Sequence, residues 1–433
     1  MMKCKFLHLS DVHLGYQQYN HKERFNDFGR AFLHIVDQAL SKEVDFVLLG
    51  GDLFQKRAID PPTLIQAIEG LGRLQEAGVP VAAVEGNHER AHYRDVFSWM
   101  DFLADRGYLT LLNPTSFKEG VPVLTAWGRE GGAYLDLNLS EEATGGRVRI
   151  YGIKYYGAST NRVVEGLAKA LADIDHDGVD YVILVMHAGL EGVLPNYSAT
   201  LSHSQLAPLR QYIDYLALGH IHKPFERDNW IYNPGSPETC GMDEAAWRDR
   251  GYYLVDVDTE QSLKHEARLV RNPRRPFVRW SLGVDTYESP EALYAAAEAQ
   301  ARREATQQAS PGQPVVELAL EGVLPFDRHE LDGKRLESIV DEAFDPILVR
   351  IANRAVPTEY EVSGDESKSR AELEREVVED LVERDARYRP FAADWAGIVL
   401  DVKRMTLEGT SPEGILDYLE SRSQLPDAEP NST

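Results

Sequence analysis

Apolar and polar residues follow two different spacings along the first part of the chain. Short apolar runs, typical of buried strands, alternate with segments in which apolar residues recur every three or four positions, as on one face of a helix. The runs predict strands at residues 5–9, 45–49, 79–84, 148–153, 181–186, 215–218, 230–233 and 252–257. The helical spacing covers residues 24–40, 61–77 and 93–106. This alternation, with its strand-rich second half, predicts an α/β fold: a two-layered β-sandwich flanked by helices.

A second pattern begins after residue 270. Strand, helix, strand, helix and strand are predicted in turn at residues 277–280, 290–305, 315–320, 335–344 and 347–352, as in a smaller α+β capping domain. Residues 370–421 then carry short amphipathic helices, which need their own domain or a partner surface to bury their apolar faces. The predicted parts are therefore domains at 1–268 and 274–356, a polar linker at 357–369, a helical segment at 370–421 and a disordered tail at 422–433.

The charge balance bears on the choice of partner. The 433 residues include 46 Lys and Arg against 70 Asp and Glu, a net charge of −24, whereas proteins that bind nucleic acids are usually basic. Because the acidic residues are spread through every region, the excess indicates a halophile's cytoplasm, where acidic surfaces keep proteins in solution. On that interpretation the net charge reflects habitat and says little about the substrate.

Signals of cellular compartment agree with a cytoplasmic location. No apolar run approaches the roughly 20 residues that span a bilayer. The N-terminal apolar stretch is too short and too interrupted for a signal peptide. The two cysteines, Cys4 and Cys240, cannot form a disulfide framework and are interpreted as reduced, buried thiols. We therefore expect a cytoplasmic protein with no membrane association.

Polar residues follow five of the predicted strands at the point where each strand ends. These strand ends read SDVH (residues 10–13), GGD (50–52), EGNHE (85–89), MHAG (186–189) and GHIH (219–222). Each fragment alone is a weak signal, since two histidines two positions apart are often only a polar strand end. In open α/β sheets, however, sites form at the carboxyl ends of the strands, so the five fragments are expected to converge.

The side chains at these strand ends are donors that suit metal ions. Seven are candidate ligands: Asp11, His13, Asp52, Asn87, His187, His220 and His222. One ion does not need seven donors, but two ions about 3.5–4 Å apart, bridged by one carboxylate, would use them all. Carboxylate and imidazole donors without a thiolate suit Mn²⁺, Fe²⁺ or Zn²⁺. The last two histidines lie on the same side of their strand, and each could bind a different ion.

The same strand ends resemble the calcineurin-like metallophosphoesterase superfamily. Within it, longer stretches are similar to the DNA double-strand-break repair nucleases of the meiotic-recombination-eleven family, called SbcD in bacteria. These stretches are LSDVHLGYQQYN, LLGGDLFQKRAIDPPTL, VEGNHER, YGIKYYGAS, VMHAGLEG, LGHIHKPF and YNPGSPE. They run from residue 6 to about residue 238, and beyond them only the order of the domains is similar. With the acidic composition, the resemblance indicates an archaeal, halophilic member.

The resemblance implies a role for each of the candidate ligands. It implies one Mn²⁺ bound by Asp11, His13 and His222, a second bound by Asn87, His187 and His220, and Asp52 as the bridge between them. His88 would not be a ligand. It would lie over the phosphate and either stabilise the developing charge or protonate the leaving oxygen.

The resemblance also implies an activity and partners. The activity is that of a double-strand 3′–5′ exonuclease and single-strand endonuclease, which processes duplex ends, hairpins and single strands of DNA. The partners are a second copy of the chain, through the helices at 61–77 and 93–106, and a Rad-fifty-type coiled-coil ATPase docked on residues 370–421.

Contacts to DNA are less well specified than the metal centre. Some family members have a histidine where this chain has Asn20, and His21 stands next to it, so the role of both residues is open. Basic residues that would contact DNA are Arg90, Arg271, Arg274 and Arg275. A solvated surface linker is an equally good interpretation of the basic cluster near residue 274.

Two other functions are compatible with the strand-end residues. A small-molecule or cyclic-nucleotide phosphodiesterase on the same fold would use the same site, but it needs neither the second domain nor the amphipathic helices after residue 270. A scaffold without activity would have lost metal ligands, and all seven positions are filled. The sequence therefore favours the nuclease.

Overall fold

The structure, a computed structural model, describes residues 2–91, 97–139, 146–195, 200–307, 312–357, 369–383, 388–407 and 410–422. The chain forms two compact units. One comprises Met1–Gly283, Pro290–Leu320 and Asp332–Arg354, and the other comprises Val284–Ser289, Glu321–Leu331 and Ala355–Thr433. The domain boundaries predicted from the sequence stay a prediction.

The first large sheet carries three of the predicted strand ends. Across the sheet, the described strands are β16 (His265–Arg271), β15 (Gly251–Asp258), β1 (Lys3–Leu9), β2 (Phe46–Leu49), β3 (Val81–Ala83) and β4 (Thr110–Leu111). Strands β1 to β4 are parallel, so their carboxyl ends lie along one edge. Strands β15 and β16 continue the sheet in antiparallel pairing from β1.

The second large sheet carries the other two predicted strand ends. Its described strands, in order across the sheet, are β13 (Phe225–Arg227), β14 (Ile231–Asn233), β12 (Tyr215–Gly219), β9 (Tyr181–His187), β8 (Arg147–Ile153) and β7 (Tyr134–Asn138). Strands β14, β12, β9 and β8 are parallel, and β13 and β7 close the two edges in antiparallel pairing.

The two sheets pack face to face because apolar residues occupy both faces of their central strands. In β1, Phe6 faces the core between the sheets, whereas Leu7 faces the core under the first layer of helices. In β9, Ile183 and Leu184 divide in the same way between the inter-sheet core and the second layer of helices. Successive side chains of a strand point to opposite faces, so continuous apolar runs of this kind are those of strands buried on both sides.

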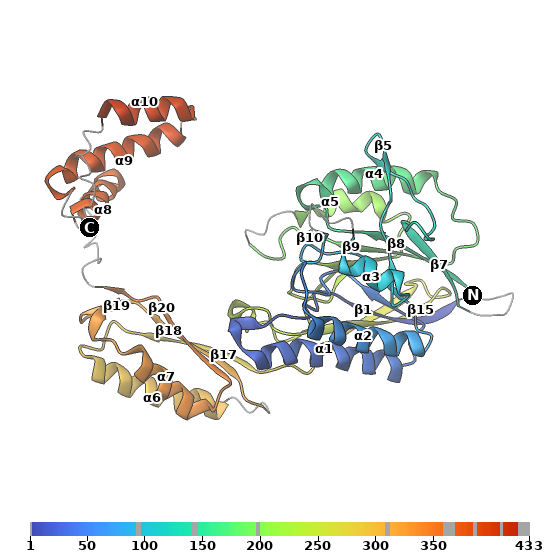
Figure 1. The fold of residues 1–433 in the computed structure, drawn as a ribbon, viewed down its shortest axis with the longest axis horizontal. Coiled ribbons are helices and arrows are strands. Elements are labelled where there is room, and N and C mark those ends of the chain that lie inside the picture. The colour runs from blue at the N-terminus through green and yellow to red at the C-terminus, as the bar shows by residue number, and fades with distance from the viewer. Residues whose placement is uncertain are drawn as a thin grey trace. The chain divides into compact units, whose positions relative to one another are not determined.

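Helices cover the outer face of each sheet (Figure 1). Against the first sheet lie α1 (Lys22–Ser41), α2 (Pro61–Glu76) and α3 (Trp99–Asp105), and against the second lie α4 (Thr160–Asp173) and α5 (His203–Leu206). The helix predicted over 93–106 begins later in the described residues, at Trp99, because Ser98 and Asp101 form a capping box; residues 93–96 lie outside them. Short pairs complete this part: β5 (Phe117–Lys118) with β6 (Val121–Pro122), and β10 (Gly189–Leu190) with β11 (Thr200–Leu201).

After β16 the chain forms the smaller α+β arrangement predicted from the sequence. Its sheet has the order β17 (Phe277–Gly283), β18 (Val315–Glu321), β20 (Leu348–Asn353), and its helices are α6 (Pro290–Gln307) and α7 (Gly333–Phe344). Two short strands, β19 (Val323–Leu324) and β21 (Val356–Pro357), pair with each other.

The C-terminal segment is helical where the structure describes it. It contains α8 (Arg370–Glu383), α9 (Ala392–Leu407) and α10 (Pro412–Arg422). The disordered tail predicted over 422–433 lies outside the described residues except for Arg422, which ends α10. Within the described part of the chain, none of the helices is long and apolar enough to cross a membrane.

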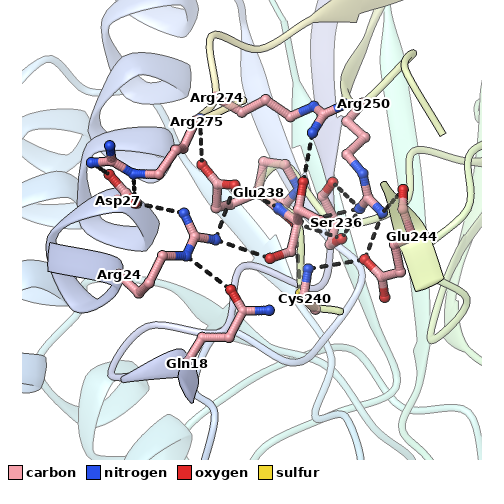
Figure 2. A network of polar contacts seen from close by, with 12 residues as sticks. Gln18, Arg24, Asp27, Ser236, Glu238, Cys240, Glu244, Arg250, Arg274 and Arg275 are labelled. Carbon is pink, nitrogen blue, oxygen red and sulfur yellow. Dashed lines mark hydrogen bonds and ion pairs between the residues drawn. The ribbon is translucent and has the colours of Figure 1, made fainter. Parts of the chain in front are cut away.

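A buried ionic network joins α1 to the loop after β14 and to the segment before β17 (Figure 2). Arg24 has no exposed surface, and its guanidinium donates hydrogen bonds to Asp27 (2.5 Å) and Glu238 (3.1 Å). Arg275 donates to the same Asp27 carboxylate at 2.6 Å. Burial opposes ionisation of Asp27, but the hydrogen bond from Arg275 and the charge of Arg24 outweigh it and hold the pKa of Asp27 below its ordinary value.

We expect Arg24→Met to lower the free energy of unfolding by about 3–5 kcal/mol, because it leaves the buried carboxylate of Glu238 without its ion pair and removes one of the cations around Asp27. Arg30 is the matched control. Its side chain is 55% exposed and also pairs with Asp27, so Arg30→Met should cost less than about 1 kcal/mol. Urea unfolding followed by circular dichroism measures the free energy of unfolding of both variants. Equal losses of free energy in the two would contradict the stabilising role of the buried Arg24.

Candidate metal centre

Five parallel strands of the two large sheets bring the predicted ligands to one place. Asp11 and His13 follow β1, Asp52 follows β2, Asn87 follows β3, His187 is the last residue of β9, and His220 and His222 follow β12. The two sheets contribute three and two of these strands, so the residues meet where the carboxyl ends of both sheets face one another.

Three of the side chains form one group. The Nε2 atoms of His13 and His222 lie 3.0 Å apart. The carboxylate of Asp11 is 4.0 Å from the first of these nitrogens and 3.9 Å from the second. These are the three residues that the family resemblance assigns to one ion.

A second group lies beside the first. Asn87 Oδ1 is 3.1 Å from His187 Nε2 and 2.9 Å from His220 Nδ1. The carboxylate of Asp52 is 3.2 Å from the same His187 nitrogen. Asp52 also shares a set with Asp11 and His187, and another with His13 and His88, in which the potential ligand atoms all lie within 4.8 Å of one another. Asp52 is therefore within reach of both groups, as a bridging carboxylate must be.

The backbone at the site adopts an uncommon conformation. Four of the seven residues have positive φ: Asp11 (53°), His13 (53°), Asp52 (52°) and His220 (92°). Residues other than glycine rarely occupy this region, and such strain persists where the surrounding structure holds it in place. Its concentration at these strand ends indicates that the side chains are aimed at a common point.

Hydrogen bonds to Nδ1, the ring nitrogen that faces away from the site, fix the orientation of two imidazoles. His187 Nδ1 lies 2.7 Å from the carbonyl oxygen of Gly50, and His222 Nδ1 lies 2.7 Å from Glu244 Oε1. Both partners accept, so each Nδ1 carries the proton and each Nε2 faces the site. A second hydrogen bond of this kind is typical of histidines that bind metal ions.

Burial and neighbouring charge act in opposite directions on the two carboxylates. Burial raises the pKa of Asp11 above its ordinary value. Burial acts the same way on Asp52, but the charge and hydrogen bond of His187 outweigh it and lower the pKa of Asp52. Burial disfavours the charged form of His187, yet Asp52 raises the pKa of that imidazole to about 9. The Asp52 carboxylate and the His187 imidazole thus stabilise each other's charged forms.

Two glycines lie so close to Asp52 and His187 that no side chain would fit in their place. A Cβ atom on Gly86 would lie 2.0 Å from Asp52 Oδ1, and one on Gly51 would lie 2.5 Å from His187 Nδ1. Gly51 also has a φ of 92°, which favours glycine. The glycines in the GGD and EGNHE fragments therefore make room for the site.

The residues present suit divalent cations. Asp11 and Asp52 are almost completely buried, and within the described residues neither forms an ion pair with a lysine or arginine. Buried carboxylates normally pair with a cation or bind a metal ion. His13 Nδ1 is also buried with no hydrogen-bond partner among the described residues. The donor set of carboxylates, imidazoles and one amide oxygen fits a two-metal site.

A family model for calcineurin-like phosphoesterases matches residues 4–224, which include all seven predicted ligands. The chain belongs to the calcineurin-like phosphoesterase family. The fold of this family implies a two-metal site, and the strand-end residues are candidate ligands for it.

Two archaeal proteins are among the curated relatives of this calcineurin-like phosphoesterase. The DNA double-strand break repair protein Mre11 of Archaeoglobus fulgidus is 32% identical over 286 residues, covering 63% of this chain and 58% of the relative. Mre11 of Haloferax volcanii is 29% identical over 287 residues, covering 65% of this chain and 55% of the relative. The chain therefore spans less than two thirds of the length of either. These matches confirm the resemblance predicted from the motifs; a halophilic source stays a prediction.

Among solved structures, the calcineurin-like phosphoesterase YfkN from Bacillus subtilis aligns with a TM-score of 0.40 at 15% identity. The alignment covers 70% of this chain and 97% of that chain.

Of the residues predicted to contact DNA, most have partners within this calcineurin-like phosphoesterase. His21 Nδ1 accepts from Glu23 N at the start of α1. Arg274 donates to Thr239 Oγ1, and Arg275 is only 11% exposed in its contact with Asp27. Arg271 is 73% exposed and pairs with Asp249. Asn20 is exposed, with a φ of 60°, and Arg90 is half-buried. Their role in DNA binding stays a prediction.

Two residues that the sequence did not point to lie at the site of this phosphoesterase. Glu244, in the turn after β14, holds His222, and Cys240 lies beside His13 and His222. The interpretation of Cys240 as a buried thiol was wrong, because its side chain is only half-buried. Neither residue follows a strand within the predicted set, so no spacing in the sequence singled them out.

Proposed function

We propose that this chain is a dinuclear-metal DNA nuclease that processes DNA ends in double-strand-break repair. The proposed activities are 3′–5′ exonuclease on duplex DNA and endonuclease on single strands. The observation that carries the proposal is the convergence of seven strand-end donors in a chain whose curated relatives are named DNA double-strand break repair proteins.

Two Mn²⁺ ions are the proposed cofactors. Asp11, His13 and His222 would hold one, Asn87, His187 and His220 would hold the other, and Asp52 would bridge them. When bound, two such ions acidify a water molecule and neutralise the oxygens of a phosphodiester. The two carboxylates supply −2 against +4, so the site stays positive although the chain carries −24. In a salt-rich cytoplasm counterion release is weak, and affinity for DNA would rest on these local contacts.

His88 is the proposed catalytic residue. Its Nδ1 lies 2.9 Å from the carbonyl oxygen of Gln55, which can only accept, so Nδ1 carries a proton in either state. The Nε2 atom therefore holds a transferable proton only when the ring is an imidazolium. In that state His88 would stabilise charge on the phosphate or protonate the leaving oxygen, whereas the neutral ring would have Nε2 as an acceptor.

The substrate class is tested with end-labelled duplex DNA and, in parallel, a cyclic nucleotide and a small phosphodiester, each with Mn²⁺ or Mg²⁺ at low and high KCl. We expect Mn²⁺-dependent shortening of the duplex, abolished by EDTA. Hydrolysis of the small substrates without any cleavage of DNA would overturn the proposal and favour a small-molecule phosphodiesterase.

A Rad-fifty-type coiled-coil ATPase is the proposed partner of the C-terminal helices. Apolar side chains on α8, α9 and α10 are exposed, among them Leu381 (53%), Leu407 (79%) and Leu416 (58%). Exposed leucines at this density indicate a surface that a partner covers. The coiled coil of such an ATPase would supply a complementary apolar face.

Docking is tested by pull-down of the ATPase with three variants. Deletion of residues 370–421 and the single change Leu416→Asp should each abolish binding, while Asp417→Asn, at the adjacent exposed polar position of the same helix, should retain it. Mn²⁺-dependent DNA cleavage is expected to survive the deletion, since none of the proposed ligands lies in these helices. Normal ATPase binding by the truncated protein would show that the docking surface lies elsewhere.

A homodimer is proposed through the region of α2 and α3. Ile65 on α2 is 62% exposed and Phe97, just before α3, is 58% exposed. Analytical ultracentrifugation should give about twice the chain mass of 48.7 kDa, and a sharp single species at the chain mass would contradict the dimer.

A further inference from the structure

Cys240 brings a thiol into the group formed by His13 and His222. One potential ligand atom from each of these three residues lies within 4.8 Å of the other two. The chain contains only one other cysteine, Cys4, on β1. The sequence-based donor set contained no thiolate, so this thiol changes which ions the site can select.

The position of Cys240 is built into the loop after β14. Its backbone N–H donates to Glu244 Oε2 at 2.9 Å, while Glu244 Oε1 accepts from His222 Nδ1 at 2.7 Å. Arg250, with no exposed surface, donates to the same carboxylate at 2.5 Å. Figure 2 shows Cys240 and Arg250 converging on Glu244. One buried carboxylate therefore fixes the thiol and the imidazole relative to each other.

The contacts of the thiol include the imidazole of His222, its neighbour in the group. Sγ makes a long contact, 3.6 Å, to the carbonyl oxygen of Glu238, and it forms a hydrogen bond with the imidazole of His222. A thiol is a weak donor, so little is lost when it turns to a metal ion. The nearby His13 is 1% exposed; its Nε2 lies 3.0 Å from His222 Nε2, and its Nδ1 has no hydrogen-bond partner among the described residues. Both side chains are thus available as ligands.

Two imidazoles and one thiolate suit a thiophilic ion. Zn²⁺ binds nitrogen at about 2.0–2.1 Å and thiolate sulfur at about 2.3 Å. Two nitrogens about 2.0–2.1 Å from one tetrahedral ion lie about 3.3–3.4 Å apart, so the Nε2 atoms of His13 and His222, which are 3.0 Å apart, need to separate only slightly to bind it. Mn²⁺, in contrast, prefers carboxylate and other oxygen donors and gains little from a thiolate.

We propose that His13, His222 and Cys240 form a site for a thiophilic divalent cation such as Zn²⁺, overlapping one of the two Mn²⁺ positions. The inference rests on the proposed metal centre for its two imidazoles and adds the thiolate as a ligand. Binding releases the thiol proton to solvent. Zn²⁺ at this site competes with Mn²⁺ and so inhibits the Mn²⁺-dependent activity.

Co²⁺ is the probe for the thiolate, because Co²⁺ bound to sulfur gives a thiolate-to-metal charge-transfer band in the near ultraviolet. Wild type and Cys4→Ser should show the band on titration, and Cys240→Ser should lack it. Cys4 is the matched control because it is buried in the inter-sheet core, and burial raises the pKa of its thiol to about 12. Cys240→Ala, with circular dichroism on each variant, guards against a folding defect in the serine variant.

Calorimetry on the same samples separates this inference from the proposed metal centre. Co²⁺ binding without the charge-transfer band would overturn the thiolate site and leave the metal centre standing. The absence of any Co²⁺ or Mn²⁺ binding would overturn both. We also expect Cys240→Ser to raise the Zn²⁺ concentration that half-displaces Mn²⁺ by about tenfold or more. If Cys240→Ser left this Zn²⁺ concentration unchanged, the proposed site would be contradicted. A charge-transfer band that persists in Cys240→Ser would contradict it as well.

Discussion

Asp52→Asn should abolish DNA cleavage and reduce the Mn²⁺ bound at saturation from two ions per chain to one or none. Asp52 is within reach of both groups of donors, because its carboxylate lies 3.2 Å from His187 Nε2 and it shares a set with His13 and His88. Loss of the bridge should cost several kcal/mol of transition-state stabilisation. Since 1.36 kcal/mol corresponds to a tenfold change in rate, cleavage should fall by roughly 10³-fold or more.

Asp45→Asn is the control for this change, because Asp45 precedes the same strand, β2, at the end away from the site, and is exposed. Cleavage of end-labelled duplex and Mn²⁺ binding by calorimetry are measured on both variants. A fully active Asp52→Asn protein that still binds two ions would show that Asp52 is not the bridge.

His88→Ser should lower the rate of DNA cleavage by about 10²–10⁴-fold while both Mn²⁺ ions stay bound, as expected for a group that acts on the phosphate. The Nδ1 atom of His88 is held by the carbonyl oxygen of Gln55, and its backbone N–H donates to Asp52 Oδ1 at 2.9 Å. The hydroxymethyl of serine keeps the backbone contact but has no group that can reach the phosphate as the imidazole does.

The geometry also permits a different role for His88, since it forms a possible ligand set with His13 and Asp52. Mn²⁺ stoichiometry distinguishes the two roles. A variant that binds one ion fewer would make His88 a ligand. His203→Ser, which changes a half-exposed histidine paired with Asp228, should alter neither cleavage nor metal binding.

The strand-end residues were predictable from the sequence because two simple rules coincide. Apolar runs located β1, β2, β3, β9 and β12, and the carboxyl ends of parallel strands meet at one edge. Residues such as Asp11 and His222, more than 200 positions apart, could therefore be placed together without knowing any loop conformation.

The parts that escaped prediction depend on loops and on side chains with several possible partners. Glu244 and Cys240 reach the site only because the loop after β14 folds back on His222, a path that carries no periodic signal. The sequence favours a surface position for Arg275, yet its side chain is largely buried because it pairs with the buried carboxylate of Asp27. The start of α3 at Trp99 was missed because Ser98 caps the helix inside an apolar stretch.

We propose that the strand ends of both sheets hold two metal ions bridged by one carboxylate. Electron paramagnetic resonance of the protein loaded with Mn²⁺ tests it most directly. We expect the spectrum of an exchange-coupled pair of Mn²⁺ ions in wild type and its loss in Asp52→Asn. A spectrum of isolated Mn²⁺ at every loading, in a protein that is folded, would contradict it.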